Sequence, residues 1–174
     1  RVKFGAAANG VSFGRFLTSV GGEFVAMSSR SFGADNPSNL TQFRGGLGAS
    51  NSYPLVGPVV LSEIHFAPTN RYDTNSTSSG EFLELLNITS NAVPLYDPAA
   101  TTNRWKLAGG VDFAFPANIT LPAGGSLLVV GFDPAANPAE LDWFRSAYQV
   151  STNVPIFGPY SGALANEGED IELL

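Results

Sequence analysis

Four ionisable side chains lie near one another in the sequence and would do chemistry if folding brought them together. Glu63 and His65 belong to an apolar run over 59–66, and Glu81 and Glu84 belong to a second run over 81–88. If the two runs pair as strands, carboxylates on neighbouring strands suit glycoside hydrolysis or calcium binding. We favour outward-facing or cross-strand polar positions beside Lys or Arg instead, because no loop with calcium-ligand spacing accompanies them.

The histidine and cysteine content narrows the chemistry further. His65 is the only histidine, and the chain has no cysteine. A histidine base needs well-placed partners, and zinc sites normally use several histidines or cysteines. We therefore favour a structural or surface role for His65 and expect no catalytic residue, no metal site and no cofactor. The chain is predicted not to be an enzyme; a deep pocket around Glu63 and Glu84 would favour the opposite.

Two further groups of residues suggest binding. The loop 73–77 is rich in oxygen atoms and would hold a cation loosely, although a solvated loop is the simpler interpretation. Four aromatic residues would form a sugar-stacking platform if they were exposed together, but core packing explains most of them. On that interpretation Trp143→Ala unfolds the protein. These four residues are Trp105, Trp143, Phe157 and Tyr160.

Composition indicates the fold class and excludes some partners. The chain has 174 residues, 19 Gly, 12 Pro and 13 Phe, with only 14% charged residues. Low charge with many turn formers and aromatics is typical of short strands joined by frequent turns. The net charge of −6 argues against nucleic acid and against an anionic membrane surface. No stretch approaches the roughly 20 apolar residues of a membrane span, so no membrane insertion is expected.

The order of elements predicts an all-β, antiparallel β-sandwich with one short helix. The segment 126–130 is apolar on both faces, which predicts a central strand. The segments 111–115 and 169–173 alternate, as half-exposed strands do. The helix is predicted over 138–148, with Asn137 as its cap, Pro138 in the first turn and Glu140 completing a capping box. One face of this helix should dock on the sandwich; its apolar residues are Leu141, Phe144 and Tyr148.

The first third of the chain has a different character. Strands are predicted over 2–4, 11–16 and 23–27, the second of them after the turn signal Asn9-Gly10. Residues 28–58 are rich in Ser, Gly, Asn and Pro, and are interpreted as a linker or long surface loop. Because so long a loop is atypical inside a compact domain, a module boundary is predicted near Gly57-Pro58.

The later segments resemble, in their order and spacing, the lamin-tail domain, and in particular its bacterial branch in large exported proteins. The resemblance covers about two thirds of the chain and implies an immunoglobulin-like sandwich used as an accessory or interaction module. On this basis 59–174 is a lamin-tail-like sandwich, and 1–27 resembles the end of such a module. The matching segments are 59–64, 81–87, 105–107, 113–116, 121–125 and 164–173.

The departure from the family pattern is informative. The sandwich over 59–174 is expected to lack its last strands, which leaves an unpaired edge that something must fill. The strands near the start have the right character to fill it, within the same chain or in a neighbouring copy, giving head-to-tail assembly. A tandem array cut at an arbitrary point would leave the same sequence. The residues assigned to this interface are Val2, Phe4, Val11, Phe13 and Phe16 on one side and Ile171 and Leu173 on the other.

Two functions remain open at this stage. The first is a non-catalytic structural and interaction module of an extracellular or cell-surface protein, which associates with neighbouring copies by strand complementation. The alternative is a module that binds an extracellular polysaccharide or other polymer for a secreted enzyme. An exposed aromatic row on one sheet face would favour the alternative. Fold resemblance alone does not choose between them.

Overall fold

The computed structural model describes residue 2 and residues 7–18, 21–31, 41, 54–76 and 78–174. The chain divides into two compact units, Arg1–Gly57 and Pro58–Leu174. The division falls where the Ser, Gly, Asn and Pro-rich stretch gives way to the first long apolar run. Most of the predicted linker, residues 32–40 and 42–53, lies outside the described residues.

The first unit contains a hairpin. Strands β1 (Phe13–Thr18) and β2 (Gly21–Ala26) pair antiparallel, with Phe13 opposite Ala26. The rings of Phe13 and Phe24 stack at 6.2 Å between centroids. Met27 continues into an isolated bridge with Pro54 and is buried. Strand β1 therefore begins two residues later than the predicted 11–16, whereas the predicted strand 2–4 lies outside the described residues except for Val2, which belongs to no strand.

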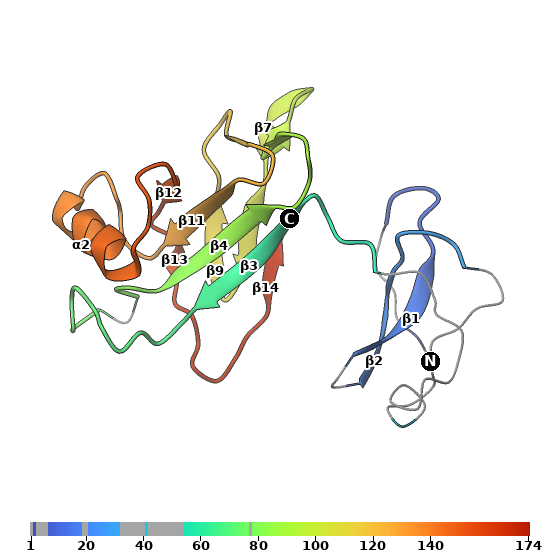
Figure 1. Cartoon of the computed structure of the whole chain (residues 1–174), viewed down its shortest axis with the longest axis horizontal. Coiled ribbons are helices and arrows are strands. Elements are labelled where there is room, and N and C mark those ends of the chain that lie inside the picture. The colour runs from blue at the N-terminus through green and yellow to red at the C-terminus, as the bar shows by residue number, and fades with distance from the viewer. Residues whose placement is uncertain (1, 3–6, 19–20, 32–40, 42–53, 77) are drawn as a thin grey trace. The chain divides into compact units, whose positions relative to one another are not determined.

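The second unit is a β-sandwich, as the sequence predicted, and Figure 1 shows its layers. One sheet has the order β12-β11-β4-β3 and the other the order β13-β9-β8-β14. The strands of these two sheets are β3 (Val59–His65), β4 (Phe82–Asn87), β8 (Lys106–Gly109), β9 (Val111–Ala114), β11 (Ser126–Val130), β12 (Ile156–Phe157), β13 (Ser161–Gly162) and β14 (Ile171–Leu173). Two small ladders accompany them, formed by β5 (Val93–Pro94) with β10 (Thr120–Leu121) and by β6 (Tyr96–Asp97) with β7 (Ala100–Arg104).

The main core lies between the two sheets. Strand β11 is central, as its two apolar faces predicted, and contributes Leu127 and Val129, both fully buried. From the opposite sheet come Leu107 and Val111. Phe115 is also fully buried in this core. Burial of this many large side chains is the dominant favourable contribution to folding.

Trp105 separates two strands of the second unit. Arg104 ends β7 and Lys106 begins β8. The Trp105 backbone N–H donates to the Leu95 carbonyl at 3.0 Å, and its own carbonyl accepts from Phe115 N at 3.1 Å. These bonds turn the backbone at Trp105 from one ladder into the next, which sequence alternation does not reveal.

One strand pair is parallel, whereas all other described pairs are antiparallel. Strands β11 and β12 run in the same direction, with Leu128 opposite Ile156. Parallel neighbours need a crossover connection, and helix α2 (Pro138–Tyr148) supplies it here. The helix has the predicted boundaries, and its crossover accounts for the single exception to the antiparallel prediction.

The helix packs against the β12-β11-β4-β3 sheet, where its apolar side chains share a core with Phe82, Leu128 and Val130. Phe144 is fully buried there, with Leu141 and Tyr148 packed beside it, so the predicted docking face is confirmed. The Phe144 ring meets Phe82 of β4 edge-on at 5.8 Å between centroids. The sheet therefore carries a core on each face.

The predicted capping box at the start of α2 is wrong. Asn137 makes no side-chain cap; its amide group donates to the Asp133 carbonyl at 3.3 Å. Glu140 instead accepts a hydrogen bond from Ser79 Oγ at 3.1 Å. Burial raises the pKa of Glu140. A tertiary partner therefore replaces the local one, and it ties the helix to the residues that precede β4.

Candidate functional site

Two edge strands lie on the same side of the sandwich. Strand β3 ends one sheet and β14 ends the other, and within the part of the chain that the structure describes neither has a second neighbour. A long unpaired edge exposes backbone N–H and C=O groups that can pair with another chain. This side of the second unit is therefore the candidate interaction site.

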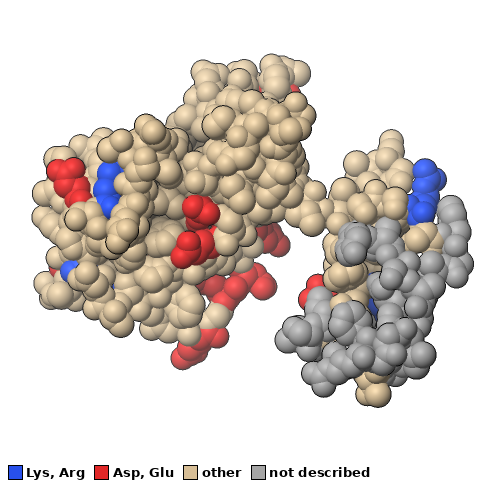
Figure 2. Space-filling model, viewed as in Figure 1, with Lys and Arg blue, Asp and Glu red and all other residues tan. Residues whose placement is uncertain are grey.

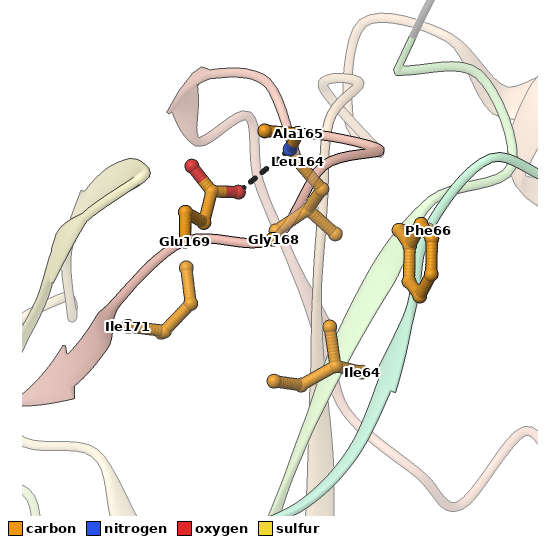
Figure 3. Close-up of a pocket in the computed structure, with 7 residues that line it drawn as sticks. All are labelled: Ile64, Phe66, Leu164, Ala165, Gly168, Glu169 and Ile171. Atoms are coloured by element: carbon orange, nitrogen blue, oxygen red, sulfur yellow. Dashed lines mark hydrogen bonds between the residues drawn. The ribbon is translucent and has the colours of Figure 1, made fainter.

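Between the two edges lies an apolar hollow of about 200 Å³. Figure 3 shows Ile64 and Phe66 on one side of it and Leu164 and Ile171 on the other. Ile64 is 46% exposed and Phe66 is 50% exposed, which is high for large apolar side chains that point between two sheets. We call this surface the open flank; its residues are Ile64, Phe66, Leu164, Ala165, Gly168, Glu169 and Ile171.

A bulge in β3 creates the open flank. The register runs from Leu61 opposite Leu85 to Glu63 opposite Glu84, so Ser62 is an extra residue on β3. A bulge shifts the inward-outward alternation by one residue. Beyond it Ile64 and Phe66 face the hollow. Ser62 Oγ donates to Glu84 Oε1 at 2.6 Å, which holds the bulge in place.

One acidic side chain lines the open flank, and the unit that carries it is acidic overall. Glu169 lies on its rim, where its Oε1 accepts a hydrogen bond from Ala165 N at 2.7 Å. Figure 2 shows acidic side chains over β3 and around the loop before β14. Residues 58–174 contain four Lys and Arg against thirteen Asp and Glu, a net −9, whereas residues 1–57 contain five against two, a net +3. The second unit is therefore net acidic, and Glu169 lies at the rim of its apolar hollow.

A second cleft lies on the outer face of the same sheet. It has a volume of about 320 Å³, and Glu63 and Glu84 stand in its wall with Phe82 and Tyr148. Glu63 lies opposite Glu84 in the strand register, as the sequence suggested. Phe82, in the wall of the same cleft, is only 7% exposed. His65 stacks on Phe82 with 5.1 Å between centroids, and it also meets Tyr148 edge-on, which is the structural role expected for it.

Glu81 does not join this cleft, so its prediction as an outward polar position is wrong. It is only 2% exposed, and its Oε2 accepts hydrogen bonds from Tyr160 Oη at 2.9 Å and from Leu164 N at 3.4 Å. A buried carboxylate needs such donors, because leaving one unpaired is costly. The local sequence does not indicate that Glu81 is buried and Glu84 only partly buried, because both belong to the same apolar run. Through Leu164, Glu81 supports the floor of the open flank.

The buried Tyr160–Glu81 pair should make the free energy of unfolding depend on pH. Burial first, and then the charge and hydrogen bond of Glu81, raise the pKa of Tyr160 above its ordinary value of 10.0. Above about pH 10 the tyrosine ionises in the unfolded chain while it stays protonated in the folded one, so the free energy of unfolding should fall as pH rises. Urea unfolding between about pH 9 and pH 11 measures this slope. Tyr160→Phe should flatten this slope, whereas the control Tyr72→Phe, at an exposed site, should leave it unchanged. Equal slopes in the original protein and both variants would contradict the assignment of the slope to Tyr160.

The residues predicted at the complementation interface lie in three places. Ile171 and Leu173 belong to β14 and pack against the main core, with Ile171 also lining the open flank. Phe13 and Phe16 belong to β1, and Val11 precedes it. Val2 is 57% exposed, and Phe4 lies outside the described residues. Ile64 and Phe66 were missed, although their alternation around His65 is a visible signal of two side chains on one face.

The four aromatic residues considered as a sugar-stacking platform pack in or against the two cores. Trp105 and Phe157 pack against the main core, and Tyr160 is buried in it. Trp143 is a residue of α2 and is partly buried against the second core, with 6.0 Å between its ring centroid and that of Tyr72. Core packing therefore accounts for all four residues, as the simpler interpretation held.

The loop over 73–77 is organised by its own hydrogen bonds over the residues that the structure describes, which exclude Thr77. Asp73 Oδ1 accepts from Asn75 N at 2.9 Å, and Ser79 Oγ accepts from Asp73 N at 3.0 Å. Across the described residues no group of three or more His, Cys, Asp or Glu side chains is arranged to hold a metal ion. None of the described helices has the length and apolar character needed to cross a membrane.

Comparison with known proteins gives no relative. No protein family, no curated protein and no solved structure matches the chain.

Proposed function

We propose that this chain is a non-catalytic structural and interaction module of an extracellular or cell-surface protein, lamin-tail-like in character, which associates with further copies of itself by strand addition. The open flank is the observation that supports this proposal. It combines two adjacent edge strands with apolar side chains that point inward but remain about half exposed. Strand addition uses such an edge for backbone hydrogen bonds and such a hollow for alternate side chains.

The polymer-binding alternative has weaker support. Sugar stacking needs the flat face of an aromatic ring in solvent. In the outer cleft Phe82 is buried, and its ring already meets His65 and Tyr148. The open flank offers an apolar hollow and backbone edges, which suit an extended peptide better than a sugar.

The test is the effect of a charge placed in the hollow. Ile64→Lys should abolish self-association, because an inward-pointing lysine on an edge strand blocks strand addition. Ile88→Lys is the matched control, since Ile88 is 50% exposed in the same unit but lies away from the flank. Sedimentation velocity of the full chain over a concentration series measures the association.

We expect the original chain and the Ile88→Lys variant to form concentration-dependent oligomers and Ile64→Lys to stay monomeric. Both substitutions alter partly exposed positions, so both variants should keep the folded circular dichroism spectrum. A chain that is monomeric at every concentration would refute the proposal. So would an Ile64→Lys variant that associates as strongly as its control.

A further inference from the structure

The β3 edge of the open flank is regular over only a short stretch. Strand β3 is bulged at Ser62, and Ala67, just beyond the strand, has a left-handed φ of 47°. Between these two points, residues 63–66 keep the inward-outward alternation of an extended strand. A strand that joins the flank along this edge must therefore pair with residues 63–66.

The two faces of this stretch have different chemistry. Ile64 and Phe66 line the hollow and are about half exposed. On the outer face Glu63 lies in the wall of the second cleft, and His65 stacks on Phe82 in the same wall. Within the described residues neither the Glu63 carboxylate nor the His65 imidazole has a hydrogen-bond partner. A carboxylate only accepts hydrogen bonds and an imidazole always carries a donor, so the stretch is complementary to its own reverse.

A second copy of β3 can join this edge antiparallel, about a two-fold axis, in three registers that keep the hollow-facing residues on one face. With the axis at Glu63, two carboxylates lie directly opposite each other, which is destabilising. With the axis at His65, Glu63 lies opposite Ala67 and gains no partner. With the axis at Ile64, each Glu63 lies opposite the His65 of the other copy, and the two Ile64 side chains meet on the hollow side.

We propose that the strand added at the open flank is β3 of a second copy, antiparallel, with Ile64 on the two-fold axis. The two hollows then adjoin, and each Ile64 covers the other. On the outer face each Glu63 accepts a hydrogen bond from the second copy's His65. This inference rests on the proposed function, and it adds the identity, direction and register of the added strand.

This arrangement has two consequences for the assembly. Each copy contributes the same edge, so the interface is isologous and the assembly closes at a dimer. Residues 58–174 have a net charge of −9, so the two sandwiches repel each other until salt screens their charges. Dimerisation should therefore strengthen as salt is raised. Sedimentation velocity at low and high salt measures this change, and weaker association at high salt would contradict the arrangement.

The first experiment tests the register, and the absence of cysteine from the chain allows single substitutions. Ile64→Cys in the full chain should form a disulfide-linked dimer with itself in oxidised glutathione. Directly opposite residues of an antiparallel pair have Cα atoms about 4.5–5.5 Å apart, within reach of a disulfide bond.

Phe66→Cys is the matched control for this cross-link. Phe66 lines the same hollow and is 50% exposed, against 46% for Ile64. In the proposed register the two Phe66 positions are four residues out of step, about 13 Å along the strands at about 3.3 Å per residue. Phe66→Cys should therefore form no dimer with itself, because a disulfide bond cannot span that distance.

The second experiment tests the outer face. Glu63→Lys should weaken dimerisation about fivefold, since two cross-strand pairs are lost at once. Asp112→Lys is the control, because it makes the same charge change at an exposed position of β9, which is not an edge strand. Asp112→Lys should leave dimerisation unchanged or strengthen it, because it lowers the net negative charge. Equal weakening by the two variants would overturn the pairing of Glu63 with His65.

The outcomes separate the two proposals. A self-linked Ile64→Cys dimer, without a Phe66→Cys dimer, supports both. Cross-linking of Ile64→Cys to Phe66→Cys but not to itself overturns the register, because it places the axis at His65. A chain that associates and is blocked by Ile64→Lys, but whose Ile64→Cys variant forms neither cross-link, retains the proposed function and overturns the choice of β3. A chain that never associates overturns both proposals.

Discussion

Replacing Glu81 with Ala is expected to destabilise the sandwich by about 3 kcal/mol, because each buried group left without its partner costs about 1–3 kcal/mol. The substitution removes the acceptor of both Tyr160 Oη and Leu164 N, and all three residues are at least 95% buried. Since native domains are stable by only about 5–15 kcal/mol, the loss would be visible as a large shift of the urea midpoint.

The control for this experiment is Glu84→Ala. Glu84 lies on β4, three residues after Glu81, but is only partly buried, and its Oε1 accepts a hydrogen bond from the exposed Ser62. Its loss should cost about 1 kcal/mol or less. A double-mutant cycle of Glu81→Ala with Tyr160→Phe should show coupling of about 1 kcal/mol, since the two groups contact each other. Additive effects, or equal costs for Glu81→Ala and Glu84→Ala, would refute the structural role of the buried carboxylate.

Replacing Phe144 with Ala should cost about 3–5 kcal/mol, as for other buried aromatic residues cut to alanine. The Phe144 ring is fully buried beneath α2 and contacts the rings of Phe82, Phe132 and Tyr148. The substitution leaves a cavity that these neighbours fill only in part. The helix should therefore loosen from the sheet before the main core is lost.

Trp143→Ala is the comparison, because the sequence singled out Trp143 as the residue whose loss unfolds the protein. Trp143 is only partly buried and packs at the margin of the second core. We expect it to cost less than Phe144→Ala. Urea unfolding followed by circular dichroism measures the loss of stability in each variant. A larger loss for Trp143→Ala than for Phe144→Ala would show that Trp143 contributes more to stability than the buried Phe144 ring.

Hydrophobic pattern alone was sufficient for the fold class and for several elements. Period-2 alternation predicted the strand containing Val111 and Phe113, and the doubly apolar run predicted the central strand β11. Helical spacing with a proline in the first turn predicted α2 with its observed bounds, Pro138–Tyr148. These signals are local, since each depends on the faces that one segment presents to a core.

The candidate site was predicted only in part, because it depends on how separate segments meet. The edge residues Ile171 and Leu173 were identified from their alternation, but Ile64 and Phe66 were not. Their orientation follows from the bulge at Ser62, and an extra residue in one strand is visible only against the register of its partner. The same limit applies to Glu81, whose donors are 79 and 83 residues away in the sequence.

The sequence by itself therefore determined that the described part of this chain is built mainly from strands, that a helix spans Pro138–Tyr148, and that the chain is acidic. Tertiary structure alone decided which glutamate is buried, which side of β3 faces the hollow, and that two sheet edges lie together. The physical reason is that burial and charge pattern are properties of single segments, whereas register, hydrogen-bond partners and open edges are properties of pairs of segments.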